Sequence, residues 1–376
     1  MSSSLSRVLA SLTCGCLFFV TSAASAKSPD EQVAKQVSDS VCRNVILVSL
    51  DGFRPEEMFS GADERLMIPE LGVKELDKYK RKYGHDDAVQ RRRLLMPHLW
   101  RQIDQGGWIA GDPLQESHVR VTNGLNFSYP GYNEMLTGFA DPKVDSNAKK
   151  YNENVTVLEW LNKQPELAGK VAAFSSWDVF PFIINDQRSG IPVNAGWSPL
   201  TIGEPARLAG LNYAAEYTIH EWGGVRYDAY TAAGAMQAMR ATQPRVLYVS
   251  LGETDDWAHS GRYDHYLDSV QLDDSFIQQI WDTAQELDAY RGTTAMVIAT
   301  DHGRGDGREG WKSHSADLPG SENIWVAAFG TGVAATGEDH GGSFTQSQVA
   351  PTVARLLGYD FQATDKRIAD PLPICQ

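Results

Sequence analysis

The apolar residues of this chain fall into short continuous runs separated by longer segments with helical periodicity. The short runs predict buried strands at residues 44–50, 171–175, 245–251, 294–300 and 324–329. The longer segments predict helices at residues 96–103, 128–138, 155–163, 229–240, 269–287 and 346–357. Strands interleaved with helices in this way indicate an α/β protein with a largely parallel central sheet. The 376 residues suffice for one large domain with an insertion or for two domains.

Three of the predicted strands end in acidic residues. Asp51, Asp255 and Asp301 each follow one such strand, and His302 follows Asp301 directly. Any one of these strand ends, taken alone, is explained as well by a solvated turn. Because parallel strands place their carboxyl ends at one edge of a sheet, we expect the three carboxylates to meet there. His259 lies four residues after Asp255, which puts both side chains on one face if that turn is helical.

A cluster of carboxylates and imidazoles without a thiolate is typical of a Zn²⁺ site, with Mn²⁺ or Fe²⁺ as alternatives. The five residues just named, with one further histidine, exceed the ligand set of a single catalytic zinc. Two ions about 4 Å apart fit better, and such a pair can stabilise the attacking and leaving oxygens of a displacement at phosphorus. We therefore predict two divalent cations as cofactors.

Ser128 begins a segment that predicts a loop entering a helix. Pro130 suits the first turn of that helix, and Gly138 suits its end. Ser128 then lies at the helix N-terminus, where the dipole favours an anion, although a simple capping serine has the same pattern. A metal can deprotonate a serine hydroxyl directly. No Gly-x-Ser-x-Gly sequence surrounds Ser128, which disfavours an ordinary serine hydrolase.

The first 26 residues have the pattern of a secretory signal peptide. Arg7 precedes an apolar stretch at residues 8–20, and Ala24-Ser25-Ala26 follows as a cleavage site. The apolar stretch is too short to span a membrane. We therefore expect a secreted or periplasmic protein that begins near Lys27.

Cleavage at that point leaves Cys42 and Cys375, one near each end of the mature chain. Chain termini often lie close together, and exported compartments permit disulfides, so we predict a Cys42–Cys375 bridge, with two unpaired thiols as the alternative. The net charge of −14 disfavours a surface for nucleic acid or anionic membrane. An anionic substrate can still bind where metal cations dominate the local field.

Residues from about 180 to 225 are rich in glycine, proline and aromatic residues and show no clear periodicity. We interpret this region as a cap-like insertion near the cleft. Trp197, Tyr213, Tyr217 and Trp222 are candidate wall residues, although local packing is the simpler explanation for them. The sequence leaves the oligomeric state open.

In their order along the chain, these motifs resemble those of the alkaline phosphatase superfamily, in particular its nucleotide pyrophosphatase/phosphodiesterase branch. The similarity runs from Asp51, in Leu-Asp-Gly-Phe-Arg, to the tail helix at residues 348–358. The resemblance implies a three-layer α/β/α sandwich with a largely parallel sheet. It also implies a single catalytic domain over residues 27–376, with the insertion described above.

The resemblance also implies a role for each motif residue. Ser128 matches the nucleophile, which faces both metals. The six expected protein ligands, three to each metal, are Asp255, His259 and His314 for one ion and Asp51, Asp301 and His302 for the other. His340 is the alternative to His314. We favour His314 because it precedes the predicted strand at residues 324–329, as the corresponding histidine of the family does, whereas His340 follows it.

Substrate contacts are less clear in the sequence. Asn154, or Asn152, is our candidate for the asparagine that donates to a phosphoryl oxygen in the phosphodiesterase branch, and Lys312 is a candidate contact for the substrate anion. A loop asparagine and an exposed lysine are the plainer interpretations. A formylglycine-dependent sulfatase needs arginine at position 132, where this chain has Tyr132.

The predicted function is therefore an exported, metal-dependent hydrolase of small-molecule phosphate esters that works through a phosphoseryl intermediate. The sequence does not distinguish a phosphomonoesterase from a phosphodiesterase. The alternatives are a sulfate-ester or phosphonate hydrolase or a phosphoryl transferase on the same scaffold, and a non-catalytic exported metal-binding protein.

Overall fold

The computed structural model describes residues 42–375, and its centre is an eight-stranded sheet. The strand order is β10-β2-β9-β7-β1-β6-β4-β5. The strands are β1 (Asn44–Leu50), β2 (Trp108–Ala110), β4 (Val171–Ser175), β5 (Val193–Ala195), β6 (Val246–Leu251), β7 (Thr294–Thr300), β9 (Val326–Gly330) and β10 (Gly337–Glu338). β9 is antiparallel to both of its neighbours, and the other pairs of this sheet are parallel. The predicted largely parallel sheet is confirmed.

A smaller three-stranded sheet has the order β11-β3-β8. Its strands are β11 (Ser343–Thr345), β3 (His118–Arg120) and β8 (Asn323–Ile324). The single strand predicted at residues 324–329 is therefore divided between two sheets. The division falls at Trp325, whose buried indole N–H donates to the carbonyl oxygen of Phe53 at 3.0 Å.

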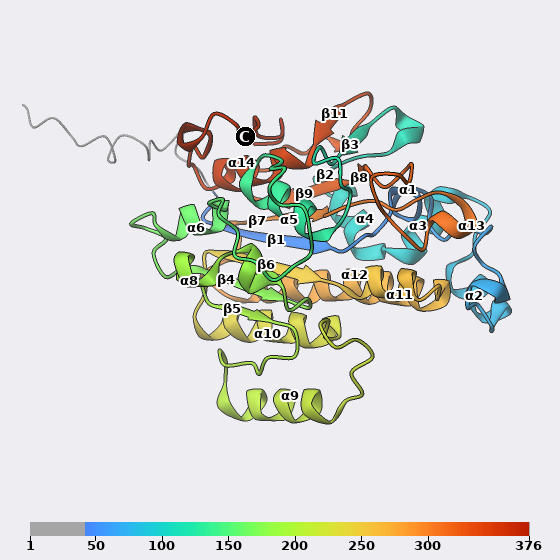
Figure 1. Ribbon diagram of the computed structural model, residues 1–376, viewed down its shortest axis with the longest axis horizontal. Helices are drawn as coiled ribbons and strands as arrows, with labels where there is room; N and C mark the ends of the chain where they lie inside the picture. Colours follow the sequence, from blue (N-terminus) through green and yellow to red (C-terminus); the bar gives the residue numbers. More distant parts are fainter. Residues whose placement is uncertain (1–41, 376) are drawn as a thin grey trace, which may run out of the picture.

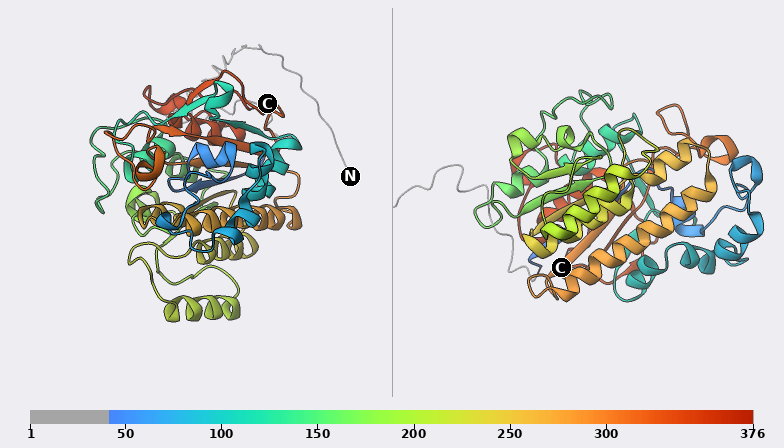
Figure 2. Two further views of the ribbon diagram at one scale, coloured as in Figure 1. Left: turned by 90° about the vertical axis from the view of Figure 1, so that its right-hand side faces the viewer. Right: turned by 90° about the horizontal axis from the view of Figure 1, so that it is seen from below.

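Helices cover both faces of the large sheet (Figures 1 and 2). They are α1 (Pro55–Ser60), α2 (Leu76–Tyr83), α3 (Ala88–Leu95), α4 (Pro97–Asp104), α5 (Ser128–Thr137), α6 (Val157–Asn162), α7 (Phe180–Ile183), α8 (Asp186–Ser189), α9 (Pro205–Tyr217), α10 (Asp228–Ala241), α11 (Glu253–His259), α12 (Tyr263–Glu286), α13 (Gly307–Gly310) and α14 (Val349–Leu356). Single 3₁₀ turns lie at Pro69–Leu71, Pro113–Gln115, Gln346–Gln348 and Gln362–Thr364.

The three layers follow from the alternation of side chains along the central strands. Val45 and Leu47 of β1 belong to a core shared with α5, α6 and α14. Ile46 and Val48 point to the opposite face, into a core shared with α4, α10 and α12. Both faces of β1 are therefore covered, which is why its sequence is continuously apolar. This arrangement is the expected α/β/α sandwich.

The region of about 180 to 225 divides into two parts. α7, α8 and β5 belong to the main body, because β5 pairs with β4 in the large sheet. α9 instead lies beyond α10, away from the sheet (Figure 1). Tyr213 and Tyr217 of α9 are exposed, whereas Trp197 stacks on His220 with ring centroids 3.6 Å apart. A cap over the cleft stays a prediction.

The predicted disulfide is wrong, because no bond joins Cys42 and Cys375 in the structure. The two thiols are directed to different backbone carbonyls. Cys42 donates to Asn44 at 3.2 Å, and Cys375 faces the oxygen of Thr352 at 4.0 Å. Burial raises the pKa of each thiol to about 11.

The predicted signal peptide at residues 1–26 lies outside the described residues. Among residues 42–375, the structure contains no helix whose length and apolar character are sufficient to cross a membrane.

Candidate active site

The three acidic strand ends come from three neighbouring strands of the large sheet. β1 lies between β7 and β6, with Leu50 level with Thr300 on one side and with Leu251 on the other. Asp51 and Asp301 are the next residues on their strands. Asp255 follows β6 in the first turn of α11. The parallel register therefore brings the three carboxylates to one edge, as the sequence predicts.

The first group of side chains consists of Asp51, Asp301 and His302, all of them buried. His302 Nε2 lies 3.3 Å from Asp51 Oδ1 and 3.4 Å from Asp301 Oδ2. Neither of these two carboxylate oxygens has a hydrogen-bond partner in the structure. His302 Nδ1 lies 2.9 Å from the carbonyl oxygen of Gly303, so this nitrogen carries the proton and Nε2 presents a lone pair to the two acids.

The second group consists of Asp255, His259 and His314. Asp255 Oδ2 lies 3.2 Å from His259 Nε2, and Asp255 Oδ1 lies 3.5 Å from His314 Nε2. The two histidine Nε2 atoms are 3.1 Å apart. His314 Nδ1 lies 2.9 Å from the backbone oxygen of Asn126, which directs Nε2 into the group.

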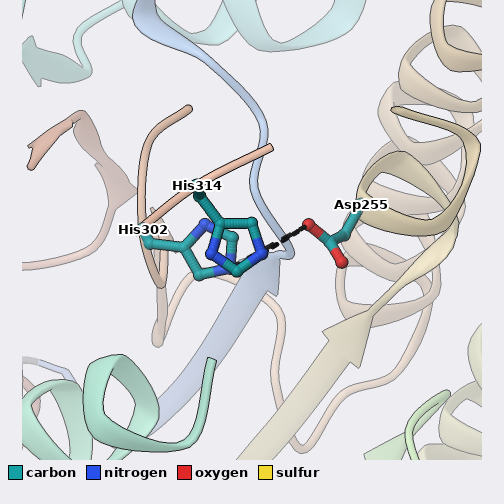
Figure 3. A group of neighbouring side chains, drawn as sticks. All are labelled: Asp255, His302 and His314. Carbon is teal, nitrogen blue, oxygen red and sulfur yellow. Dashed lines mark ion pairs between the residues drawn. The ribbon is translucent and has the colours of Figure 1, made fainter. Parts of the chain in front are cut away.

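The two groups touch through stacked imidazole rings. Figure 3 shows His302 and His314 side by side, with Asp255 facing them from its helix. The ring centroids of His302 and His314 are 3.7 Å apart, and His302 Nε2 lies 4.0 Å from Asp255 Oδ1. His302 thus belongs to one group of three with Asp51 and Asp301 and to another with Asp255 and His314.

Burial sets the charges of these side chains. Burial, together with the nearby carboxylate of Asp255, raises the pKa of Asp51 to about 7, and burial raises that of Asp301 well above its usual value. Burial also lowers the pKa of His302 to about 4 and that of His314 to about 3, which keeps both imidazoles neutral. Burial opposes ionisation of Asp255 as well, but the guanidinium of Arg304 together with His259 and His314 outweighs burial and holds the pKa of Asp255 well below the usual value.

This arrangement fits divalent cations. Neutral imidazoles and carboxylates are the ligands of Zn²⁺ and related ions, and the two unpartnered oxygens of Asp51 and Asp301 face the lone pair of His302. Buried carboxylates this close together repel one another unless positive charge lies between them. Two overlapping groups of these side chains could each hold an ion, Asp51, Asp301 and His302 in one and Asp255, His302 and His314 in the other, and His259 lies beside the second group.

Ser128 lies at the start of α5, beside the first group. Its hydroxyl oxygen is 3.4 Å from His302 Nε2. Pro130 stands in the first turn of the ten-residue helix, and Gly138 ends it with a positive φ of 83°. Gly131 allows the close approach of α5, because a Cβ there would overlap the carbonyl oxygen of Asp301. The sequence prediction of a serine at a helix N-terminus agrees with this structure.

Two side-chain contacts fix this helix. Tyr132, on the same helix face as Ser128, donates from its hydroxyl to Asp51 Oδ2 at 2.9 Å. Glu134 is fully buried and accepts hydrogen bonds from the backbone N–H groups of Thr122 and Asn123 and from the hydroxyl of Ser347. Charge-assisted bonds of this kind are the stronger ones in proteins. The helix that carries Ser128 is thus held by two buried contacts in its interior.

Other predicted residues lie elsewhere. His340 contacts Gln115 and is exposed, so His314, not His340, joins the cluster. The side-chain amide of Asn154 donates to Asn133 and Asp141. Lys312 pairs with Glu309.

The sequence analysis missed three residues at the cluster. Tyr132 and Arg304 contact Asp51 and Asp255, respectively, and Asn147 accepts a hydrogen bond at 2.9 Å from the backbone N–H of Tyr129, the residue after Ser128. Arg304 follows His302 by two residues, which was a usable signal. Nothing in the sequence distinguishes Asn147 from the other asparagines of its loop.

No protein-family model matches the sequence, and no curated protein matches it significantly. Solved structures do match. The wild-type alkaline phosphatase PafA is similar with a TM-score of 0.56 and 12% identity, over 90% of this chain and 99% of that chain.

Two further matches are domains of larger proteins. The soluble domain of lipooligosaccharide phosphoethanolamine transferase A from Neisseria meningitidis has a TM-score of 0.53 and 14% identity, over 92% of this chain and 96% of that chain. The C-terminal periplasmic domain of EcEptC from Escherichia coli, solved in complex with Zn, has a TM-score of 0.53 and 10% identity, over 90% of this chain and 88% of that chain. At sequence identities this low, the similarity shows the fold and does not show the reaction.

Proposed function

The chain has the fold of the alkaline phosphatase superfamily, and we propose that it is a metal-dependent hydrolase of phosphate esters with Ser128 as its nucleophile. One observation carries the proposal. The Ser128 hydroxyl, at a helix N-terminus, contacts the same His302 nitrogen that faces two unpartnered carboxylate oxygens. The candidate nucleophile and the first candidate cation site therefore meet at the same nitrogen of His302.

We assign the ligands by their grouping. Asp51, Asp301 and His302 would hold one divalent cation, and Asp255, His259 and His314 would hold the other. When bound, such ions lower the pKa of a hydroxyl and neutralise charge on a transferring phosphoryl group. Zn²⁺ is the first candidate, because the donors are imidazole and carboxylate and because the similar EcEptC domain was solved with Zn.

Ser128 then carries the covalent chemistry. Its oxygen attacks phosphorus, the bond from phosphorus to the ester oxygen breaks, and the alcohol leaves with the proton that the serine gives up. Water attacks the phosphoseryl group in a second step, releases phosphate or a phosphomonoester, and restores the hydroxyl. The dipole of α5 stabilises the negative oxygens in both steps.

Asn147 is a better candidate than Asn154 for the phosphoryl contact. Its side-chain oxygen accepts a hydrogen bond from the backbone N–H of Tyr129 at 2.9 Å. The amide group of Asn147 therefore lies at the N-terminal end of α5, where we expect the substrate. The amide of Asn154 is bound to Asn133 and Asp141 instead.

The test is hydrolysis of p-nitrophenyl phosphate, bis-p-nitrophenyl phosphate and p-nitrophenyl sulfate by the purified protein with Zn²⁺ or Mn²⁺. The phosphate esters should be cleaved faster than the sulfate. Ser128→Ala should abolish turnover and leave the metal content unchanged, whereas Ser260→Ala, at an exposed serine after α11, should match the wild type. Full activity of Ser128→Ala would rule out the covalent mechanism.

The same panel decides between the alternatives. Preferred cleavage of the sulfate ester would indicate a sulfatase, and transfer of the phosphoryl group to an added alcohol, in place of release to water, would indicate a transferase. Metal binding without turnover of any ester would indicate a binding protein. The proposal also includes export, and a mature N-terminus at Lys27 is the expected result of N-terminal sequencing after expression with the full leader.

A further inference from the structure

Arg304 is a buried arginine whose three guanidinium nitrogens are all engaged. Its Nη1 contacts Asp255 Oδ1. Its Nε donates to the carbonyl oxygen of Trp311 at 2.6 Å, and its Nη2 donates to that of Lys312 at 2.8 Å. The residue is 1% exposed, so these protein groups replace water around the charge.

These bonds join two segments that carry ligands of the second group. Asp255 lies on α11, and Lys312 precedes His314 by two residues. A further bond fixes the segment that contains Lys312 and His314, because the backbone N–H of Gly305 donates to the carbonyl oxygen of Ser313 at 3.0 Å. One planar cation therefore ties the His314 segment to Asp255.

The pair also packs on the first group. A Cβ on Gly52 would lie 2.7 Å from Arg304 Nη1 and 2.9 Å from Asp255 Oδ1. Gly52 follows Asp51, so the backbone of the first ligand segment closes over the ion pair. The space that glycine leaves is filled by the contact between Arg304 and Asp255.

We propose that Arg304 is a positioning residue for the candidate metal site of Asp255, His259 and His314. It holds the segment of residues 311–314 in place and orients the carboxylate of Asp255, so that His314 reaches the site. The proposal rests on the metal centre proposed above. It goes beyond that centre because Arg304 is not one of the six candidate ligands, and its guanidinium nitrogens are all engaged by protein groups.

The geometry explains why arginine is needed. The guanidinium is planar, permanently charged and offers five donors in a fixed fork, whereas the lysine ammonium is a point charge on a flexible stem. Lysine at this position could bind Asp255 or one carbonyl oxygen but could not span all three acceptors. Positioning groups behind metal ligands typically change metal affinity by about 10- to 100-fold.

The first arm of the test uses the metal-free protein. Trypsin cuts after lysine, and the Lys312–Ser313 bond lies in the segment that Arg304 holds. With the metal removed by chelator, Arg304→Met should be cut at this bond about tenfold faster than the wild type. Arg304→Lys should be intermediate. Equal rates for all three proteins would overturn the proposal.

The second arm measures bound zinc and its affinity by competition with a chromophoric chelator. The wild type should bind two ions, and Arg304→Met should retain one. Arg304→Lys should bind the second ion about tenfold more weakly, and it carries the test if Arg304→Met does not fold. Two ions bound with wild-type affinity by either folded variant would overturn the proposal.

Arg92→Met is the matched control. Arg92 is also buried and pairs with Glu338 through two bonds of 2.9 and 2.6 Å, but it contacts none of the six ligands. This variant should lose stability yet keep both ions and the slow cleavage at Lys312. If the wild type itself binds no metal, the proposed function fails, while the cleavage rates of the metal-free proteins still decide whether Arg304 holds the segment.

Discussion

Tyr132→Phe tests whether the carboxylate of Asp51 is tuned from outside the metal site. Tyr132 is fully buried, and its hydroxyl donates to Asp51 Oδ2 at 2.9 Å. Its ring packs edge-on against Phe180 with centroids 4.6 Å apart, and phenylalanine preserves that contact. The substitution therefore removes the hydrogen bond to Asp51 and a longer one, at 3.4 Å, that the Ser250 hydroxyl donates to Tyr132, and it leaves the core packing intact.

The expected magnitude follows from the charge of the acceptor. A hydrogen bond to a charged group contributes about 1.5–3 kcal/mol, which corresponds to about a 10- to 150-fold loss of metal affinity if the bond acts on the bound state. Burial raises the pKa of Asp51 to about 7, and the hydrogen bond from Tyr132 lowers it. Its removal raises that pKa further, so protons compete more strongly with the metal and the loss should be larger at pH 6 than at pH 8.

The assay is zinc affinity by chelator competition at several pH values, together with the rate of phosphate-ester hydrolysis. Tyr290→Phe is the control, because its buried hydroxyl donates to the neutral backbone oxygen of Pro244 at 2.8 Å. It should cost some stability and leave zinc affinity unchanged. Wild-type affinity and pH dependence in Tyr132→Phe would refute the reasoning, because the contact with Asp51 would then have no influence on the site.

Two further predictions concern the framework around the site. Gly131→Ala should destabilise the protein by about 1–3 kcal/mol in urea unfolding and weaken zinc binding, because the new Cβ meets the backbone of Asp301. The control Gly210→Ala lies in open space on α9 and should instead stabilise the protein by about 0.5–1 kcal/mol. Equal effects of the two substitutions would contradict the argument. Asp274 accepts two backbone N–H bonds at the start of α4, and burial raises its pKa to about 6 from 3.8. Because the pKa of Asp274 is raised in the folded state, its carboxyl stabilises the fold at low pH, and this stabilisation is lost as the pH rises from about 4 to 6. The free energy of unfolding should fall by at most about 3 kcal/mol over this range relative to that of Asp274→Asn. Parallel pH profiles of the two unfolding free energies would refute the prediction.

The cluster of carboxylates and imidazoles could be predicted because it depends on short sequence patterns. Asp51 and Asp301 follow continuously apolar strands, and parallel strands place such residues at one edge. His314 could be preferred to His340 because the resemblance to the alkaline phosphatase superfamily implies a histidine just before the predicted strand. These inferences needed the order of elements along the chain and no detail of side-chain packing.

Other features depend on how distant segments dock. The apolar pattern of Val326–Gly330 is the same whether the strand runs parallel or antiparallel to its neighbours, so the sequence did not reveal its antiparallel pairing. The contact of Tyr132 with Asp51 exists because Gly131 lets α5 approach β7, and the approach of Asn147 depends on the path of its loop. The disulfide prediction failed because chain ends that lie near one another can still direct their thiols to different carbonyls.

The pairing of β1 has a consequence for the order of folding. Asn44 is level with Thr294, and Val45 with Val246, so the strand synthesised first has its partners in the last half of the chain. Loop closure over such distances is slow, and β1 cannot gain both neighbours until the segment containing β7 has left the ribosome. Of the three clustered acids, Asp51 is the first to be synthesised, yet it reaches its final surroundings only after Asp255 and Asp301 have been synthesised as well.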